Sequence, residues 1–567
     1  MKIRSFEVWN FKSIEYSKKI LFPRISILIG PNNSGKSSLV QSLLLMKQTI
    51  EAEEPSIPLV LNGPEIQLGE YKDFIHGEDL SRPFIIKFNF EKDQNGRYIC
   101  EVCGKDYKQI KWFLKHVEKN HPSYWTKKKG DISKEAYHLP KNPSLRFQYR
   151  FNPKTSTIIL QELELKNPNP IEGLILSAIK LIQLKSNRIR IQAISRNEKP
   201  VYTRDYKLPK NIEVDHNSMV RLFNRFTGGQ YYLVHGAGSK EKERISLLED
   251  DLGNVLDSIF FEKISWDRSP LSVSDFESLY RKLNDEQKLA VGLLSRLNMF
   301  YWSLMECLED VKIFLQDIRH IGPLRNWPER IYFGTGGKPT TVGVKGEFTQ
   351  DIIWRDFNVE HETLINNINN WLGKLNFGFK LEVYSLSVGG IYQLKVIEND
   401  LSVNIVDIGF GLSQILPILA ECINFSLTDI RLRRDREVYF PFFIKEESDV
   451  NRLLITEQPE IHLNPKIQAA LGDFFVQIGK SDRTLLIETH SEHLLSRIQR
   501  RVADGTLNPE DVIIYYISKQ DNKSEIEEIS ISNKGVFSYW PEGFFQDDFE
   551  EAIEILKESL RGNRRGK

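Results

Sequence analysis

The order of apolar and polar residues along the chain predicts an α/β fold. A β-branched apolar run at 25–29, bounded by a proline and a glycine, is typical of a buried parallel strand. The apolar residues at 38–46 follow directly and predict a buried helix. Two further apolar runs, 452–456 and 484–488, each end in polar residues and predict more parallel strands. Core strands are therefore expected near both ends of the sequence.

Between these ends the pattern changes twice. Residues 145–165 alternate as strands do, whereas residues 280–318 carry apolar side chains at helical spacing. No heptad pattern is sustained, so long coiled-coil arms are not expected. We expect an N-terminal lobe, an inserted module, a mainly helical middle region, a C-terminal lobe and a terminal helix with a basic tail. Their expected bounds are 1–85, 86–145, 146–319, 320–545 and 546–567.

Composition excludes some partners and leaves others open. Lysine plus arginine equals aspartate plus glutamate, 77 each among 567 residues, so no overall field attracts the chain to nucleic acid or membrane. The basic tail 561–567 could still form a local patch or simply be solvated. No apolar run approaches the roughly 20 residues that span a bilayer, the N-terminus lacks a signal-peptide core, and four cysteines do not make a disulfide scaffold. We expect a soluble, cytoplasmic protein without membrane contact.

The clearest chemical motif lies between the first predicted strand and helix. Residues 30–37 fit G-x-x-x-x-G-K-[ST], the P-loop whose backbone N–H groups cradle phosphates. Lys36 would reach the β- and γ-phosphates, and the Ser37 hydroxyl would bind Mg²⁺. ATP or GTP is therefore expected. The expected nucleotide-binding residues are Gly30, Asn32, Asn33, Ser34, Gly35, Lys36, Ser37 and Ser38. Gln67 or Asp73 could assist the metal or the attacking water, or serve as turn and cap residues.

A second motif predicts a metal centre in the inserted module. Cys100, Cys103, His116 and His121 have the spacing of a Cys₂His₂ zinc finger. Such a ββα finger needs Zn²⁺ together with a few packed side chains, and the expected ones are Tyr98, Tyr107 and Phe113. In a DNA-reading finger, base edges would face Gln109, Trp112 and Lys115. Because tryptophan suits a base edge poorly and one finger covers about three base pairs, a structural or protein-docking use is favoured over DNA reading.

Three further motifs fall in the C-terminal lobe. Gly411, Ser413 and Gln414 open an apolar helix whose N-terminus suits a phosphate, and since the chain has its own P-loop, that phosphate could be the γ-phosphate bound to another subunit. Glu457 ends an apolar strand in the Walker B arrangement, where a carboxylate holds Mg²⁺ opposite Ser37. His490 follows the next strand and could touch the γ-phosphate and the attacking water, or be a hydrogen-bonded structural histidine.

Taken in order, these four motifs resemble those of ABC-type ATPases in the SMC, RecF and OLD branch. The resemblance implies an ABC-type head built from two sequence-distant lobes, with two ATP molecules held between two heads. It also implies Ser413 facing the nucleotide of the other copy, Glu457 on Mg²⁺ and His490 as the switch histidine. The closing residues 535–545 are similar to the end of bacterial anti-phage ATPase subunits such as Septu PtuA, and more loosely to the PARIS ATPase. Such subunits imply a separate HNH-type nuclease or toxin effector, with a phage protein or DNA as trigger.

The sequence departs from this branch in ways that affect activity. Gln458 stands where most ABC ATPases have a glutamate, and because an amide cannot accept a proton from water, slow hydrolysis is expected, with Glu460 as a possible substitute. The residues after 545 are too few for the Toprim nuclease domain of OLD proteins. A RecF-like ATPase that binds DNA directly is the alternative function, and a stand-alone nuclease is less expected.

Overall fold

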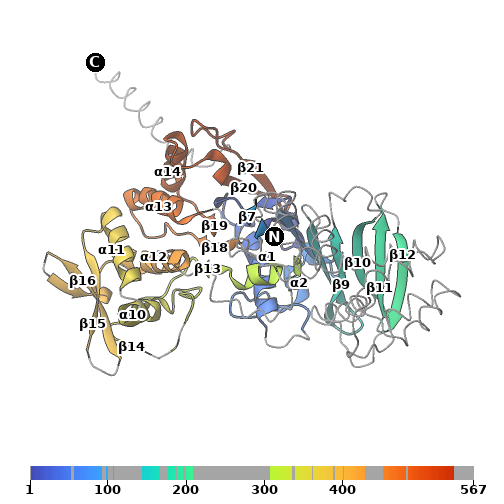
Figure 1. The fold of residues 1–567 in the computed structure, drawn as a ribbon, viewed down its shortest axis with the longest axis horizontal. Helices are drawn as coiled ribbons and strands as arrows, with labels where there is room; N and C mark the ends of the chain where they lie inside the picture. Colours follow the sequence, from blue (N-terminus) through green and yellow to red (C-terminus); the bar gives the residue numbers. More distant parts are fainter. Residues whose placement is uncertain are drawn as a thin grey trace, which may run out of the picture. The chain divides into compact units, whose positions relative to one another are not determined.

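The computed structural model divides into two compact units, each assembled from segments distant in sequence (Figure 1). The first unit comprises Met1–Ile3, Thr49–Leu61 and Leu80–Lys312, and the second comprises Arg4–Gln48, Asn62–Asp79 and Ile313–Lys567. The structure describes residues 2–52, 57–91, 98–99, 106–107, 143–166, 176–184, 188–195, 200–207, 307–308, 310–334, 337, 339–359, 362–386, 390–399, 401–427, 451–480 and 483–541.

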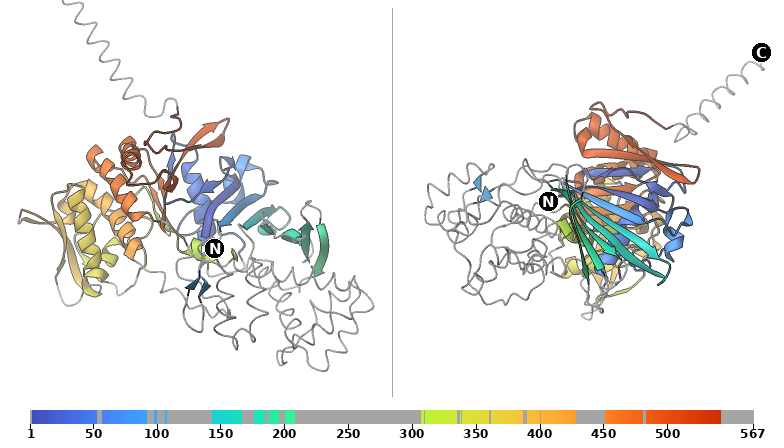
Figure 2. Two further views of the ribbon diagram at one scale, coloured as in Figure 1. Left: turned by 45° about the horizontal axis from the view of Figure 1, so that its top comes forward. Right: turned by 90° about the vertical axis from the view of Figure 1, so that its right-hand side faces the viewer.

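The described part of the first unit is dominated by antiparallel strands in the order β12-β11-β10-β9-β8-β5, shown in light blue to green in Figure 2. These strands are β5 (Phe84–Glu91), β8 (Ser144–Asn152), β9 (Thr157–Lys166), β10 (Leu176–Leu184), β11 (Arg188–Ser195) and β12 (Pro200–Lys207). Alternate side chains of β5 are buried, and Phe88 meets Phe147 of β8 edge to face. The expectation of a mainly helical middle region is thus wrong for residues 146–207, because their alternating pattern forms a sheet with one buried face. Residues 208–306 lie outside the described residues.

Two short strands fall within the predicted zinc finger. β6 (Tyr98–Ile99) and β7 (Asp106–Tyr107) pair antiparallel, with Tyr98 opposite Tyr107. The four predicted zinc ligands, Cys100, Cys103, His116 and His121, lie outside the described residues. Among the residues that are described, no group of three or more histidine, cysteine or acidic side chains is arranged to hold a metal.

The second unit begins with the predicted β-rich lead-in. β1 (Lys2–Phe11) pairs antiparallel with both β2 (Ile14–Tyr16) and β3 (Ile20–Leu21). Phe6, Val8 and Phe11 are fully buried, and the short turns bring the chain back to the strand that precedes the P-loop.

The core of the second unit is a sheet in the order β13-β18-β19-β4-β20-β21, parallel except for β21. Its strands are β4 (Ile25–Ile29), β13 (Arg319–Ile321), β18 (Arg452–Glu457), β19 (Arg483–Glu488), β20 (Val512–Gln520) and β21 (Lys523–Ile529). All five residues of β4 are buried, which explains its unbroken apolar run. Because β4 lies between β19 and β20, residues from both ends of the sequence share one sheet, and the predicted α/β fold is confirmed.

Helices and a small second sheet complete this unit. The helices are α1 (Lys36–Glu51), α2 (Tyr71–Phe74), η1 (His76–Glu78), α10 (Thr349–Val359), α11 (Thr363–Lys374), η3 (Ile405–Asp407), α12 (Phe410–Leu427), α13 (Pro465–Ile478), α14 (Glu492–Ala503) and η6 (Pro509–Asp511). The small sheet contains β14 (Tyr332–Phe333), β15 (Lys380–Ser385), β16 (Ile391–Glu398) and β17 (Leu401–Asn404).

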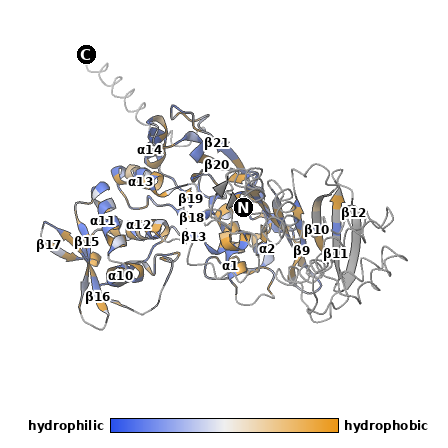
Figure 3. Cartoon of the chain, viewed as in Figure 1, coloured by the Kyte–Doolittle hydropathy of each residue, from blue (hydrophilic) through white to orange (hydrophobic). Residues whose placement is uncertain are grey.

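The helices α1 and α12 carry much of the apolar surface, coloured orange in Figure 3. Of the described helices, α12 alone is long and apolar enough to match a membrane span. However, 78% of its residues are buried within the protein, so burial in the core accounts for its apolar composition.

Candidate nucleotide and cation site

The P-loop joins β4 to α1 as predicted, and its glycines are required by close backbone packing. Gly30 has a φ of 143°, and a Cβ there would lie 2.0 Å from the carbonyl oxygen of Ile517 in β20. Gly35 has a φ of 111°, and its Cβ would lie 2.2 Å from Oγ of Ser524 in β21. Since L-residues rarely adopt these angles, larger side chains would strain the loop and displace it from the sheet.

Lys36 lies at the start of α1 with its ammonium turned toward the loop. Its Nζ donates hydrogen bonds to the carbonyl oxygens of Gly30 (2.9 Å) and Pro31 (2.8 Å). Burial lowers the pKa of Lys36, although the charges of Glu488 and Glu460 oppose that shift. Asn32 and Asn33 are exposed on the outer side of the loop, whereas Ser34 is buried. The loop therefore presents one cation and the helix N-terminus at the carboxyl end of the sheet.

The hydroxyl of Ser37 faces a carboxylate that the sequence analysis did not select. Ser37 Oγ donates to Glu488, at 3.0 Å from Oε2 and 3.3 Å from Oε1. Glu488 ends β19, and in the parallel register it lies directly beside Glu457 at the end of β18. Burial, and then the charge of Glu457, raise the pKa of Glu488 to about 7, while Lys36 and Ser37 act in the opposite direction. Two carboxyl groups and a serine hydroxyl therefore meet at one end of the sheet, beside the P-loop.

Glu457 is anchored from the other side by a buried histidine. Nε2 of His320, at the middle of β13, lies 2.8 Å from Oε1 of Glu457. The other ring nitrogen, Nδ1, lies 3.5 Å from Oε2 of Glu65, which in turn pairs with Lys47 of α1. Burial lowers the pKa of His320, but the hydrogen bonds and charges of Glu457 and Glu65 outweigh it and raise the pKa overall. A chain of alternating charges thus runs from the P-loop helix to the end of β18.

The residues after β18 and β19 are cross-linked through the backbone. Gln458, in the left-handed conformation with a φ of 47°, donates its N–H to the carbonyl oxygen of Glu488 (2.7 Å). Glu460 accepts a 2.6 Å hydrogen bond from the backbone N–H of His490. Burial, followed by the charge of Lys36, lowers the pKa of His490, which favours its neutral form. Glu457, Gln458, Glu460 and His490 are therefore brought together, as the sequence predicts.

A buried arginine lies behind this cluster. Arg325 is 6% exposed and donates from Nη2 to the carbonyl oxygen of Glu457 (2.8 Å). Its Nε and Nη1 have no hydrogen-bond partner among the described residues. Burial lowers the pKa of Arg325 to about 10, with the charges of Glu460 and Glu457 opposing the shift. Arg325 therefore balances part of the negative charge at the ends of β18 and β19.

The predicted helix start at Gly411, Ser413 and Gln414 lies in the first turns of α12. Ser413 Oγ donates to the carbonyl oxygen of Phe410 (2.6 Å), and Gln414 Nε2 lies 3.5 Å from Ser413 Oγ. Pro417 has no N–H, so the carbonyl of Ser413 lacks its helical partner. The hydrogen bonds found for Ser413 among the described residues stay within its own helix, and none joins it to the P-loop of the same chain.

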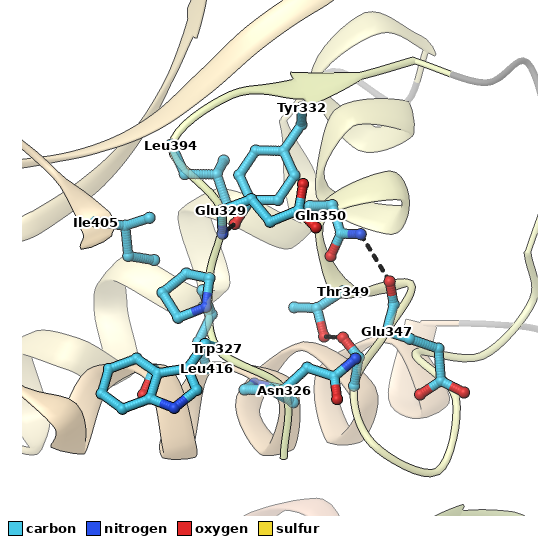
Figure 4. Close-up of a pocket in the computed structure, with 14 residues that line it drawn as sticks. Asn326, Trp327, Glu329, Tyr332, Glu347, Thr349, Gln350, Leu394, Ile405 and Leu416 are labelled. Atoms are coloured by element: carbon cyan, nitrogen blue, oxygen red, sulfur yellow. Dashed lines mark hydrogen bonds between the residues drawn. The ribbon is translucent and has the colours of Figure 1, made fainter.

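A pocket of about 80 Å³ borders Ser413 and is shown in Figure 4. Its walls come from the 326–332 segment and from the start of α10, where Gln350 Nε2 donates to the carbonyl oxygen of Glu347 (2.6 Å). Ligand pockets for small molecules usually measure about 300–1,000 Å³. This pocket is therefore too small to hold a nucleotide by itself.

The residues between 62 and 79 act in local structure. Asp73 Oδ2 accepts a hydrogen bond from the N–H of Glu70 (2.7 Å) at the start of α2, so Asp73 is a cap residue. Gln67 forms an isolated β-bridge with Asn62 and is exposed. Of the two open alternatives for these residues, the structural one is observed.

Comparison with known proteins identifies the family. The family described as AAA ATPase domain matches residues 1–495, which is most of the chain. The chain belongs to this family. Residues 507–555 match a second family, described as a protein of unknown function (DUF3696). No curated protein matches the chain.

Solved structures with similarity to this ATPase include three SMC head domains. One is the head of Pyrococcus furiosus Smc with an extended coiled coil, bound to the C-terminal domain of ScpA, at 12% identity, TM-score 0.34, 99% of this chain and 99% of that chain. A second is an SmcHead bound to the C-winged helix domain of ScpA, at 11% identity, TM-score 0.36, 94% of this chain and 98% of that chain. The third is the SMC head domain from Thermotoga maritima, at 8% identity, TM-score 0.31, 94% of this chain and 100% of that chain.

The ATPase family implies ATP with Mg²⁺, and the residues present fit both ligands. Mg²⁺ prefers hard oxygen ligands, and the Ser37 hydroxyl lies beside the carboxylates of Glu488 and Glu457. Lys36 provides the cation expected beside the phosphates.

Four site residues were missed in the sequence: Glu65, His320, Arg325 and Glu488. Glu488 had a readable signal, because it ends an apolar run just before His490 in the same way that Glu457 ends its own run. His320 and Arg325 flank the Gly322-Pro323 turn, which marks the end of a strand but says nothing about the neighbour of that strand. Glu65 had no signal, since its partners Lys47 and His320 are defined by tertiary packing.

Proposed function

We propose that this ATPase is a nucleotide-gated switch that pairs with a second copy of itself when ATP binds. The observation that carries the proposal is the cluster of Lys36, Ser37, Glu488 and Glu457 at the carboxyl end of the parallel sheet. Fixed cationic and carboxylate groups at a P-loop suit a Mg²⁺-bound triphosphate. Ser413, at a helix N-terminus away from this P-loop, would complete the site of the partner copy.

We further propose that hydrolysis is slow, with Glu457 on Mg²⁺ and His490 near the γ-phosphate. Gln458 carries an amide, which can orient a water molecule but cannot accept its proton. Glu460 is the nearest candidate base, yet its Oε1 already accepts the N–H of His490. A long-lived ATP-bound pair supports a signalling role better than a role that needs rapid turnover.

The partner proposed for the ATP-bound pair is a separate nuclease or toxin in bacterial anti-phage defence. This proposal rests on the resemblance of the motifs at 30–37, 411–414, 457–460 and 489–491 and of the closing residues 535–545 to Septu-type ATPase subunits. A RecF-like ATPase that binds DNA directly is the second candidate, because the same motifs occur in that branch.

The experiment that tests the switch is the molar mass in solution, measured by light scattering with ATP, ADP or no nucleotide. We expect dimers or higher oligomers with ATP and monomers with ADP, and wild-type monomers under all three conditions would contradict the proposal. Co-purification of the chain with the products of its neighbouring genes separates the two functions. A stoichiometric nuclease or toxin supports the first, whereas recovery of the chain alone with tight ATP-dependent binding to plain duplex DNA supports the second.

A Zn²⁺-binding finger at residues 98–121 is also proposed. The pairing of Tyr98 with Tyr107 supports it, because the first two ligands, Cys100 and Cys103, would fall between the paired strands of a ββα hairpin. Its use would be structural or protein-docking rather than base reading, since Trp112 stands at a base-facing position.

A further inference from the structure

Glu488 has the position of a cation ligand, although it lies outside the Walker B stretch 457–460. Both of its carboxylate oxygens lie within 3.3 Å of Ser37 Oγ, the hydroxyl expected on Mg²⁺. Its side chain is 3% exposed, so its solvation must come from protein groups or from a ligand at the P-loop.

Glu457, by contrast, has one oxygen held away from Ser37. Oε1 of Glu457 is bound by Nε2 of His320 at 2.8 Å, and His320 is itself fixed by Glu65 on its other side. No hydrogen bond joins Ser37 to Glu457 among those found for the described residues. The carboxylate nearest the serine hydroxyl is therefore the one on β19.

The charges at this end of the sheet require a further cation. Glu457 and Glu488 are direct neighbours in the parallel register, and Glu460 lies close enough for Lys36 to sense its charge. Lys36 and the buried Arg325 offset two of these three carboxylates, and a triphosphate would add more negative charge. Arg325 also keeps two guanidinium nitrogens without an acceptor among the described residues, so this end of the sheet has unused polar capacity.

We infer that Glu488 is a second acidic residue of the Mg²⁺ site, which holds the cation together with Ser37 and Glu457 when ATP is bound. Glu488 would bind the ion directly or through one water, on the face that His320 leaves open. Its role is to hold the cation and to position the phosphates, and no proton transfer is assigned to it. The inference rests on the proposed nucleotide site.

The test measures ATP affinity by calorimetry with Mg²⁺ and, separately, with EDTA, in wild-type protein and in Glu488→Gln. The glutamine keeps the shape and removes the charge. We expect the ratio of the two dissociation constants, EDTA over Mg²⁺, to fall about tenfold, since altering groups that support a metal typically costs about 10–100-fold in metal affinity. Affinity in EDTA should stay equal or improve, because a negative charge near the phosphates is lost. Glu492→Gln, an exposed carboxylate in the first turn of α14, is the matched control and should leave the ratio unchanged.

Two outcomes separate the inference from the proposed site. If wild-type protein binds ATP and Glu488→Gln has the wild-type ratio, Glu488 does not hold the cation. If wild-type protein fails to bind ATP in either buffer, the nucleotide site itself is wrong. Should the glutamine variant not fold, Glu488→Asp keeps the charge but withdraws it by one methylene, and a ratio equal to that of wild-type protein would again overturn the inference. Mn²⁺·ATP binding followed by electron paramagnetic resonance gives a readout independent of hydrolysis, and a changed Mn²⁺ spectrum in Glu488→Gln is expected.

Discussion

Replacing His320 by alanine should destabilise this ATPase more than the loss of any ordinary buried histidine. The imidazole lies between Glu457 and Glu65, at 2.8 Å and 3.5 Å, and its side chain is 4% exposed. Removing it leaves two buried carboxylates that have lost their shared partner. Breaking a buried ion pair in this way costs about 3–5 kcal/mol. For a unit of this size, roughly 2 °C is lost per kcal/mol, so the unfolding midpoint should fall by about 6–10 °C.

The matched control for this substitution is His76→Ala. His76 is also buried, but its Nδ1 contacts only a backbone carbonyl, that of Lys12, at 2.8 Å. Loss of one such hydrogen bond costs about 1 kcal/mol, or roughly 2 °C. Differential scanning fluorimetry without nucleotide compares the two variants directly. Equal midpoints for His320→Ala and His76→Ala would refute the argument from uncompensated charge.

A double substitution tests whether the charges are coupled. In His320→Ala with Glu65→Gln, one of the two stranded carboxylates is neutralised, so the double variant should be more stable than the sum of the two single losses predicts. Interaction energies between contacting groups are commonly about 0.5–3 kcal/mol. Strict additivity would show that Glu65 and His320 act independently, despite their proximity.

Three further predictions concern the proposed functions. Lys36→Ala should remove detectable ATP binding in calorimetry, because the P-loop cation is lost, whereas Lys72→Ala, at an exposed lysine of α2, should bind normally. Ser413→Arg should block ATP-dependent pairing in light-scattering measurements while preserving ATP affinity, since a bulky cation would fill the helix N-terminus offered to the partner; unimpaired pairing would argue against a composite site. Cys100→Ser should lower bound zinc, measured by mass spectrometry of the metal, from one equivalent to near zero, and Cys422→Ser, at a buried free cysteine, should not; equal zinc in both would exclude the finger.

The local parts of the site were readable in the sequence because each is encoded by neighbouring residues. The run at 25–29, the P-loop and α1 follow one another without interruption, so composition and spacing specify them together. The apolar runs before Glu457 and Glu488 likewise predicted strands that the parallel register confirms. What these patterns could not provide was the order of strands in the sheet.

Strand order explains why Glu488 was overlooked. Sequence motifs placed Glu457 opposite Ser37, but β19 lies between β18 and β4, so the residue at the end of β19 is the nearer neighbour of the P-loop. His320 was invisible for the same reason, because β13 has only three residues and becomes meaningful only beside β18. The middle region failed differently: the helical spacing at 280–318 dominated the expectation, and the alternating residues before it received too little weight.

The arrangement of charges links nucleotide binding to cation binding more tightly than a P-loop alone would require. With Glu457 drawn toward His320 and Glu488 toward Ser37, the two carboxylates border the space in which a cation would bridge them. A triphosphate without a cation would enter beside uncompensated negative charge, whereas a triphosphate with Mg²⁺ would neutralise it. The nucleotide and the ion should therefore bind as a pair. Since Gln458 cannot accept a proton from water, that bound state should persist, and persistence is what a switch that signals to a separate partner needs.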